Sequence, residues 1–332
     1  MSGPAQDHGT TAASGRNAVV GLGLAAVGRP AYITPGRGRD LGASRSVAEL
    51  EADARAVLDA AYAAGVRYVD AARSYGLAER FLGGWLRDHP EVADVTVASK
   101  WGYAYVGGWR LDAAVHEVKD HGLAAYETQL GETRAELGRV PDVYQVHSLT
   151  PDSPALDDRA LHHALAALRD GGTTVGFSTS GPHQADVVRR ALDLEVDGAP
   201  LFGVVQSTWN VLEPSVGPAL AEAAAAGLRV VVKEAVANGR LVGTEGDEAP
   251  AARAVADLAR ELEVSPDRVA LAAALAQPWA AVVLSGAVTP DQVRSNVGAG
   301  DVDLPSGWLD PVLARAEASE AYWQQRSRRA WT

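Results

Sequence analysis

Several residues that can act as acids, bases or hydrogen-bond donors follow short apolar runs along this 332-residue chain. Asp70, Lys100 and His147 each end such a run, and Tyr75 follows Asp70 by five residues. These are residue types that enzymes use as general acids, bases and electrostatic stabilisers. Each also has a simpler explanation as a helix cap, an ion-pair partner, a core histidine or a packing tyrosine. Ser178, Gln206 and Ser285 end three further runs.

Lys100 is the least ordinary of these residues. The chain has only three lysines, Lys100, Lys119 and Lys233, and otherwise uses arginine for positive charge. Lys100 ends the apolar run 95–99, so its ammonium group must emerge from a buried strand. A buried lysine needs a partner or a lowered pKa. Asp70 can supply that partner, either in a structural ion pair or in a catalytic one.

The apolar runs themselves indicate how these residues are positioned. They are apolar at successive positions, which is typical of strands covered on both faces. The eight runs are Val19–Leu22, Val66–Asp70, Val95–Lys100, Val143–His147, Thr174–Ser178, Phe202–Gln206, Val230–Val232 and Val282–Leu284. Amphipathic helical stretches separate them without a linker, which predicts a single-domain α/β fold, the (β/α)8 TIM barrel. We expect a flexible tail over 1–17 and a barrel with a C-terminal helical tail over 18–332.

Capping signals mark the ends of several predicted helices. Ser46 and Glu49 form a capping-box pattern, and Gly65 stands where a left-handed helix end is expected. Ser265 and Pro266 predict an N-cap followed by a first-turn proline. The segment 21–26 lacks the third glycine of a dinucleotide-binding G-x-G-x-x-G motif, so we interpret its glycine pair as a turn.

Composition excludes several classes of protein. There is no cysteine, so disulfides and thiolate chemistry are excluded. The net charge of −12 argues against nucleic-acid or anionic-membrane partners. The sequence contains no run of 18 apolar residues, so it predicts no membrane-spanning helix. The N-terminal segment lacks the basic start and the apolar core of a secretory signal. We expect a cytoplasmic protein, and the sequence does not predict its oligomeric state.

Five motifs in order along residues 18–298 resemble those of the aldo-keto reductase superfamily. They are Asp70-Ala71-Ala72-Arg73-Ser74-Tyr75-Gly76 with Glu79, Lys100-Trp101-Gly102, Asp142–Ser148, Gly176-Phe177-Ser178-Thr179 and Val205–Asn210. The resemblance implies nicotinamide-dependent reduction of an aldehyde or ketone to an alcohol, or the reverse oxidation.

The same resemblance implies roles for the four candidate residues. Tyr75 would be the general acid, His147 would orient and polarise the carbonyl, and Asp70 would hold Lys100 in place. An ammonium about 4 Å away contributes roughly 4 kcal/mol at an effective dielectric of about 20, or about three pKa units. We therefore expect Lys100 to lower the pKa of Tyr75.

The implied cofactor contacts match the family in part. Ser178 and Gln206 stand where the family grips the carboxamide, but Thr179 replaces the usual asparagine. Lys233 stands where the family places a stacking tyrosine; it could meet the pyrophosphate or the substrate, or form a salt bridge. The predicted cofactor-binding residues are Gly23, Ser178, Thr179, Gln206, Lys233, Ser285, Gly286, Gln292 and Asn296.

The segment 284–296 aligns with the family's clamp for the ribose 2′-phosphate. Thr289 and Pro290 predict a helix N-terminus that faces the anion. The basic residues expected at Gly286 or Thr289, and at Gln292, are missing, and only Arg294 remains nearby. The family favours NADP(H), and the depleted clamp leaves NAD(H) open.

Substrate specificity is expected in variable loops, with Trp101 and Trp209 as predicted substrate-binding residues. The partner would be a small carbonyl or alcohol compound. Two alternatives remain: a cofactor-binding barrel that acts as a sensor or regulatory subunit, and a metal-dependent barrel hydrolase. The hydrolase needs clustered ligands at strand ends, and only one of the eight histidines stands there. We predict no metal site.

Overall fold

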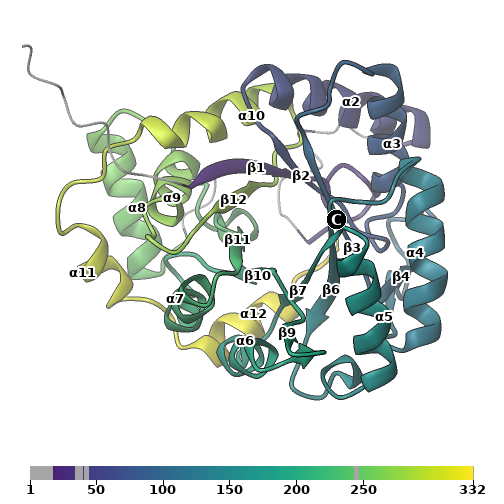
Figure 1. The fold of residues 1–332 in the computed structure, drawn as a ribbon. Coiled ribbons are helices and arrows are strands. Elements are labelled where there is room, and N and C mark those ends of the chain that lie inside the picture. Colours follow the sequence, from purple (N-terminus) through teal and green to yellow (C-terminus); the bar gives the residue numbers. More distant parts are fainter. Residues whose placement is uncertain (1–17, 34–39, 41–44, 243–246, 332) are drawn as a thin grey trace, which may run out of the picture.

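Eight parallel strands close into one barrel, in the order β1-β12-β11-β10-β7-β6-β3-β2 (Figure 1). The computed structural model describes residues 18–33, 40, 45–242 and 247–331. The barrel strands are β1 (Val19–Gly23), β2 (Tyr68–Asp70), β3 (Thr96–Trp101), β6 (Val143–Leu149), β7 (Thr174–Thr179), β10 (Val204–Thr208), β11 (Arg229–Lys233) and β12 (Val282–Ser285). The predicted (β/α)8 barrel is confirmed, and all eight apolar runs supply its strands. The predicted tail over 1–17 lies outside the described residues.

Helices surround the barrel, as Figure 1 shows, because their apolar faces pack against the outer surfaces of the strands. They are α2 (Val47–Ala63), α3 (Ala78–Asp88), α4 (Leu123–Leu137), α5 (Arg159–Asp170), α6 (Gln184–Leu192), α7 (Gly217–Ala225), α8 (Pro250–Glu261), α9 (Pro266–Leu275), α10 (Pro290–Val297), α11 (Leu309–Leu313) and α12 (Ser319–Ser327). Two antiparallel pairs lie outside the barrel: β4 (Tyr103–Tyr105) with β5 (Glu117–Lys119), and β8 (Glu195–Val196) with β9 (Ala199–Pro200).

The capping predictions hold with one exception. Ser46 and Glu49 form the reciprocal capping box of α2, and Gly65 has a φ of +88° after that helix. Pro266 opens α9 as predicted, but the Ser265 hydroxyl makes no cap hydrogen bond. It bonds instead to the hydroxyl of Ser295 on α10, 3.1 Å away, because the two helices pack together at this point.

The glycine pair near the N-terminus does not form the predicted turn. Gly21 and Gly23 both lie within β1. A Cβ atom at Gly21 would stand only 2.7 Å from the side chain of Val282 on β12, so the glycine allows these neighbouring strands to pack.

The interior of the barrel explains which side chains reach its mouth. A buried apolar layer fills the interior with Tyr68, Ala98, Val143, Val204, Val231, Val282 and Leu284, which come from six strands. Successive side chains of a strand alternate between its two faces, so the residue two positions later points into the same interior. Those residues are Asp70, Lys100, Gln145, Gln206 and Lys233. The strands therefore deliver one polar layer above the apolar one, at their C-terminal ends.

Within the described ranges, no helix combines the length and the apolar character that a bilayer crossing needs.

Candidate active site

Asp70, Lys100 and Tyr75 meet at the C-terminal end of the barrel. Lys100 is fully buried, and its Nζ donates hydrogen bonds to Asp70 Oδ2, to the Ala71 carbonyl at 3.0 Å and to the Tyr75 hydroxyl at 3.4 Å. All three ammonium protons thus have acceptors. The ammonium is held between a carboxylate from β2 and a phenol from the loop after it.

Gln206 is the second hydrogen-bond partner of the Asp70 carboxylate. Its Nε2 donates to Asp70 Oδ1 at 2.9 Å, so both carboxylate oxygens accept hydrogen bonds. The inward alternation of β10 places Gln206 there, across the barrel from β2. One N–H of Nε2 is used by Asp70, so the predicted contact between Gln206 and a carboxamide falls to the Oε1 atom and the second N–H of Nε2.

His147 reaches the same cluster through an irregularity in β6, whose register with β7 shifts between Val146 and Leu149. Its ring stands edge-on to the Tyr75 ring, with centroids 5.5 Å apart. Its Nδ1 lies 3.4 Å from the Ser74 hydroxyl, and its carbonyl oxygen lies 2.8 Å from His121 Nε2. The structure thus brings together all four residues of the predicted tetrad.

Burial sets the protonation of two members of the cluster. Burial lowers the pKa of Lys100, and the charge of Asp70 opposes that shift. The pKa of His147 falls well below its usual value because the ring is desolvated and because Lys100 and Lys233 are nearby. His147 is therefore a neutral imidazole at neutral pH, able to donate from one ring nitrogen.

The expected lowering of the Tyr75 pKa by Lys100 is not found. Burial raises the pKa of Tyr75 well above its usual value, and Asp70 raises it further. Lys100 does not act on the phenol as an isolated charge, because Asp70 pairs with it and opposes its effect. Arg29 is the nearby cation that opposes the rise. Tyr75 is consequently a protonated phenol at neutral pH.

Arg29 is a site residue that sequence reasoning did not identify. Its guanidinium lies over three aromatic rings, 5.1 Å from the centroid of Tyr75, 4.8 Å from Tyr32 and 4.7 Å from Trp331. Nη1 also donates to the Ser74 carbonyl at 3.0 Å and to Glu117 at 2.5 Å. Nothing in the spacing of Arg29 signals this, because most of its contacts come from distant segments: the loop after β2, the β5 hairpin and the C-terminal segment.

The C-terminal segment and the β4–β5 hairpin border the tetrad. Trp331 stacks on His116, with ring centroids 4.4 Å apart, and the Tyr103 ring lies 5.1 Å from that of His147. A groove of about 490 Å³ is lined here by Tyr103, Leu111, Asp112, Ala113, Ala114, His116, Glu117 and Trp331. This groove lies beside the candidate site and is shaped largely by aromatic rings.

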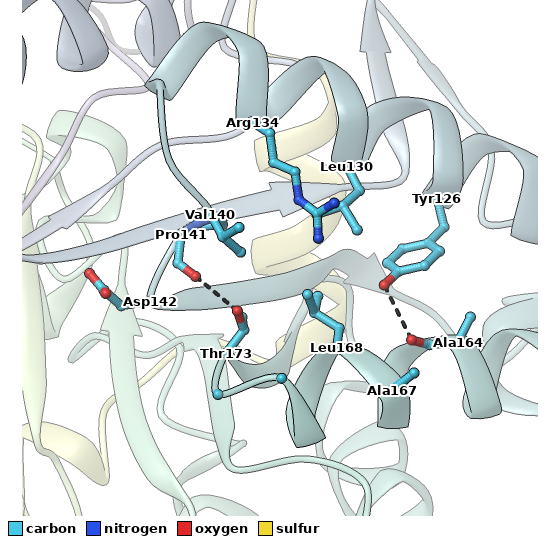
Figure 2. A pocket seen from close by; sticks show the side chains of 12 residues that line it. Tyr126, Leu130, Arg134, Val140, Pro141, Asp142, Ala164, Ala167, Leu168 and Thr173 are labelled. Atoms are coloured by element: carbon cyan, nitrogen blue, oxygen red, sulfur yellow. Dashed lines mark hydrogen bonds between the residues drawn. The ribbon is translucent and has the colours of Figure 1, made fainter.

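A second groove lies at the other end of the barrel. It runs between α4 and α5, where Figure 2 shows Tyr126, Leu130 and Arg134 facing Ala164 and Leu168. Residues 140–142 and 171–173, which line its end, precede β6 and β7. Barrel enzymes place their chemistry at the opposite, C-terminal ends of the strands. The groove is therefore separate from the tetrad.

The two predicted substrate tryptophans lie in the core. Trp101 is fully buried against Tyr126, with ring centroids 5.1 Å apart, and Trp209 packs on Trp279 at 5.8 Å. Both belong to the large cluster between strands and helices. The aromatic side chains that border the tetrad are instead Tyr103 and Trp331.

Lys233 lies at the end of β11, in register with Thr208. Its Nζ donates to the Thr208 hydroxyl at 2.6 Å and stands 3.9 Å from Glu234 Oε1. Glu234 is bound more closely by Arg326 of α12, whose Nε lies 2.9 Å from Oε2 and whose Nη2 binds Oε1. The predicted salt bridge of Lys233 is thus present but long.

The predicted carboxamide contacts are only partly available. The Ser178 hydroxyl accepts from the Ser148 backbone N–H at 2.8 Å and keeps its own proton to donate. The Thr179 hydroxyl is already engaged with the Ser207 hydroxyl at 2.7 Å. Ser178 and the Oε1 atom of Gln206 together offer a donor and an acceptor, which is the pattern that binds a carboxamide.

The predicted phosphate segment forms a loop and a helix start after β12. Thr289 caps α10 by accepting from the Gln292 backbone N–H at 3.2 Å. Asn296 donates to the Ser285 hydroxyl at 2.7 Å, which fixes the loop at exposed Gly286. Gly23 on β1 lies across from this loop, since a Cβ atom there would be 3.6 Å from the Ser285 carbonyl.

Among the described residues, positive charge is scarce at this loop. Arg294 pairs with Asp291 on its own helix. The Gln292 amide donates to Asp40 Oδ2 at 3.0 Å, so a carboxylate stands beside the position where the family has a basic residue. Pro290 carries no N–H and the Gln292 N–H already bonds to Thr289, so the described residues at the start of α10 offer few donors to an anion.

No group of three or more His, Asp or Glu side chains within the described ranges is arranged to hold a metal ion. His162, which the sequence places in a helix, is buried, and its Nε2 bonds to the Ala155 carbonyl at 2.8 Å.

The structure places this protein among the (β/α)8 barrels, with an Asp, Tyr, Lys and His cluster at the C-terminal ends of the strands. Sequence comparison identifies its family. The family model for the aldo/keto reductase family matches residues 42–308, and the chain belongs to that family. It is therefore an oxidoreductase of carbonyl and alcohol groups.

Individual relatives are distant. Protein tas of Escherichia coli is 26% identical over 322 residues, covering 81% of this chain and 89% of that protein. Pyridoxal 4-dehydrogenase of Microbacterium luteolum is 26% identical over 291 residues, covering 74% and 83%. Among solved structures, a holo aldo-keto reductase from Bacillus halodurans has a TM-score of 0.67 and a glycerol dehydrogenase from Gluconobacter oxydans 0.66. Each is 22% identical and covers 90% of this chain and 92% of its own.

Proposed function

We propose that this protein reduces an aldehyde or ketone to an alcohol, or catalyses the reverse oxidation, with a nicotinamide dinucleotide as cofactor and Tyr75 as the general acid. The observation that carries the proposal is the joint contact of Lys100 with Asp70 and Tyr75, with His147 edge-on to the phenol. These four groups meet at the barrel mouth, where Asp70 and Lys100 are buried and Tyr75 and His147 are partly buried.

Each residue has a part that its surroundings support. The raised pKa of Tyr75 keeps the phenol protonated, so its hydroxyl holds the proton that a carbonyl oxygen needs. Lys100 donates to the phenol oxygen and stabilises it as the proton leaves. Neutral His147 donates to the same carbonyl oxygen and orients it. Asp70 and Gln206 hold the Lys100 ammonium in position.

The nicotinamide, when bound, supplies the hydride. The donor and acceptor at Ser178 and Gln206 fit a carboxamide, and the Gln145 amide is fully buried without a hydrogen-bond partner among the described residues. We propose that Gly23, Ser285, Gly286 and Asn296 hold the adenosine half at the start of α10. Family membership favours NADP(H), while Asp40 beside Gln292 weakens the preference, so NAD(H) is also accepted.

Replacing Tyr75 by phenylalanine tests the proposal. The change removes only the hydroxyl, so the ring keeps its packing against Arg29 and His147. Loss of a general acid lowers kcat by about 10²–10⁴-fold, while cofactor affinity stays within about twofold. The rate is measured with a substrate whose chemical step limits turnover, and affinity by fluorescence titration. Wild-type turnover in the variant would refute the assignment of Tyr75.

A further inference from the structure

Among the described residues, the charged side chains that act on Tyr75, His147 and Lys233 do not balance. They are four cations, Arg29, Lys100, Lys233 and Arg326, and three anions, Asp70, Glu117 and Glu234. Glu79 also acts on Lys100, but it is paired with Arg73. Three close pairs account for six of these seven charges. They are Arg29 with Glu117, Lys100 with Asp70 and Arg326 with Glu234. Lys233 is the cation left over.

The hydrogen bonds of Lys233 confirm that its charge is under-compensated. Among the described residues, its Nζ has one acceptor within hydrogen-bond distance, the neutral Thr208 hydroxyl. Glu234 Oε1 is 3.9 Å away, and both oxygens of that carboxylate accept from Arg326. Burial alone would raise the pKa of Glu234, but Arg326 and Lys233 lower that pKa to about 2. Glu234 is therefore ionised, and its single negative charge is shared by two cations. An ammonium has three protons, and two remain for a ligand.

The direction of Lys233 places this charge at the reacting end of the site. Val231 belongs to the interior layer, so Lys233, two residues later, points into the barrel mouth. Its charge acts on His147, Lys100 and Asp70, the groups that surround the carbonyl position in the proposed reaction. In a chain of net charge −12, an under-compensated and largely buried cation at this place is an unusual feature.

We propose that Lys233 binds an anionic group of the substrate, a carboxylate or a phosphate, and so selects acidic carbonyl compounds. This inference rests on the proposed function and adds the class of substrate. The phosphates of the cofactor are the competing source of the same charge. The contacts of Lys233 favour the substrate, because Lys233 acts directly on His147 and Lys100 of the tetrad, whereas the predicted phosphate segment follows a different strand, β12.

Titration of Lys233 gives the proposal a characteristic pH dependence. Burial lowers the pKa of Lys233 to about 8, with Glu234 and Asp70 opposing that shift and Arg326 and Lys100 adding to it. His147 also faces Lys233 but is neutral. Only the ammonium form attracts an anion, so we expect KM for an acidic substrate to rise above about pH 8, by up to tenfold for each pH unit. A neutral substrate should not show this rise.

Matched substrates isolate the charge. The kcat/KM of the full-length enzyme is measured for 4-carboxybenzaldehyde against methyl 4-formylbenzoate, and for succinic semialdehyde against methyl 4-oxobutanoate. We expect wild type to favour the acid of at least one pair by about tenfold or more, equivalent to about 1.4 kcal/mol. Lys233→Met should abolish that preference through KM, and Lys233→Arg should restore part of it. Lys119→Met, which removes an exposed lysine from β5, is the control and should keep the preference.

Direct binding separates this inference from the proposed function. Calorimetry with the unreactive 4-carboxybenzoate should show binding to wild type that is lost in Lys233→Met, even if no aldehyde is turned over. Equal acid preference in wild type and Lys233→Met would overturn the inference and leave the proposed function intact. So would a tenfold loss of NADPH affinity in the variant with the acid preference unchanged, since Lys233 would then hold a cofactor phosphate.

Discussion

Replacing Lys233 by methionine should make the protein more stable at neutral pH. The Lys233 side chain is only 15% exposed, and burial lowers its pKa from 10.5 to about 8. That difference corresponds to roughly 3 kcal/mol by which the folded state disfavours the charged form. Methionine keeps the apolar stem but loses the hydrogen bond to Thr208, which contributes about 1 kcal/mol. We expect a net gain of about 2 kcal/mol, or a rise in Tm of about 3 °C for a chain of this size.

The gain should depend on pH with a defined sign. Because the pKa of Lys233 is lower in the folded than in the unfolded chain, the folded state binds fewer protons between about pH 8 and 10.5. The wild type therefore recovers stability as the pH rises through that window. The advantage of the variant should be full below about pH 8 and absent near pH 10.5.

Urea denaturation of both proteins at pH 7 and pH 10.5 measures this difference. Lys119→Met is the matched control, because its side chain is exposed and its removal should change stability by less than about 0.5 kcal/mol. A variant that is less stable than wild type at pH 7, or a difference that is the same at both pH values, would show that Lys233 is a satisfied structural cation. The charge imbalance around the tetrad would then be misread.

The remaining predictions concern the tetrad and the cofactor. Lys100→Met leaves buried Asp70 without its cation and should cost about 3–5 kcal/mol in unfolding measurements, most of which Lys100→Met/Asp70→Asn should recover without restoring turnover. The double variant Lys100→Met/Tyr75→Phe should have a kcat only slightly below that of the worse single variant. Strictly additive losses would show that the two side chains act separately. Fluorescence titration should find less than about a hundredfold preference between NADPH and NADH, equivalent to about 2.7 kcal/mol, because Asp40 stands beside Gln292. A larger preference for NADPH would mean that residues outside this segment hold the 2′-phosphate. The Gln292→Arg variant should prefer NADPH more strongly than the wild type does.

The barrel could be predicted from the sequence because its signal is local and repeated. Each strand is a short apolar run, and each helix carries its own start or stop, as Ser46, Glu49 and Gly65 show. The glycine pair of β1 was misread as a turn because the reason for its glycines is not local. Gly21 is required by the side chain of Val282, which is 261 positions away in the sequence and adjacent in the barrel.

The tetrad could also be placed from the sequence, since parallel strands bring their C-terminal ends to one edge. What could not be predicted is how much of the surrounding charge is compensated. Glu117 and Arg326 come from a hairpin and from the last helix, and neither stands at a strand end. The direction of the Tyr75 pKa shift could not be predicted for the same reason. Lys100 can be recognised in the sequence, but the burial of the phenol and the opposing charge of Asp70 depend on the fold.

A comparison of Lys233 with Lys100 shows that the pairing of a buried charge says more about function here than the place of the residue in the barrel. Lys100 and Lys233 point into the same interior from β3 and β11, and burial lowers the pKa of both. Lys100 has a carboxylate in direct contact, so its ammonium can be explained by the protein alone. Lys233 has a hydroxyl and a carboxylate that Arg326 already binds, so the protein alone leaves its charge without a close partner among the described residues. A ligand that brings a negative charge would provide that partner.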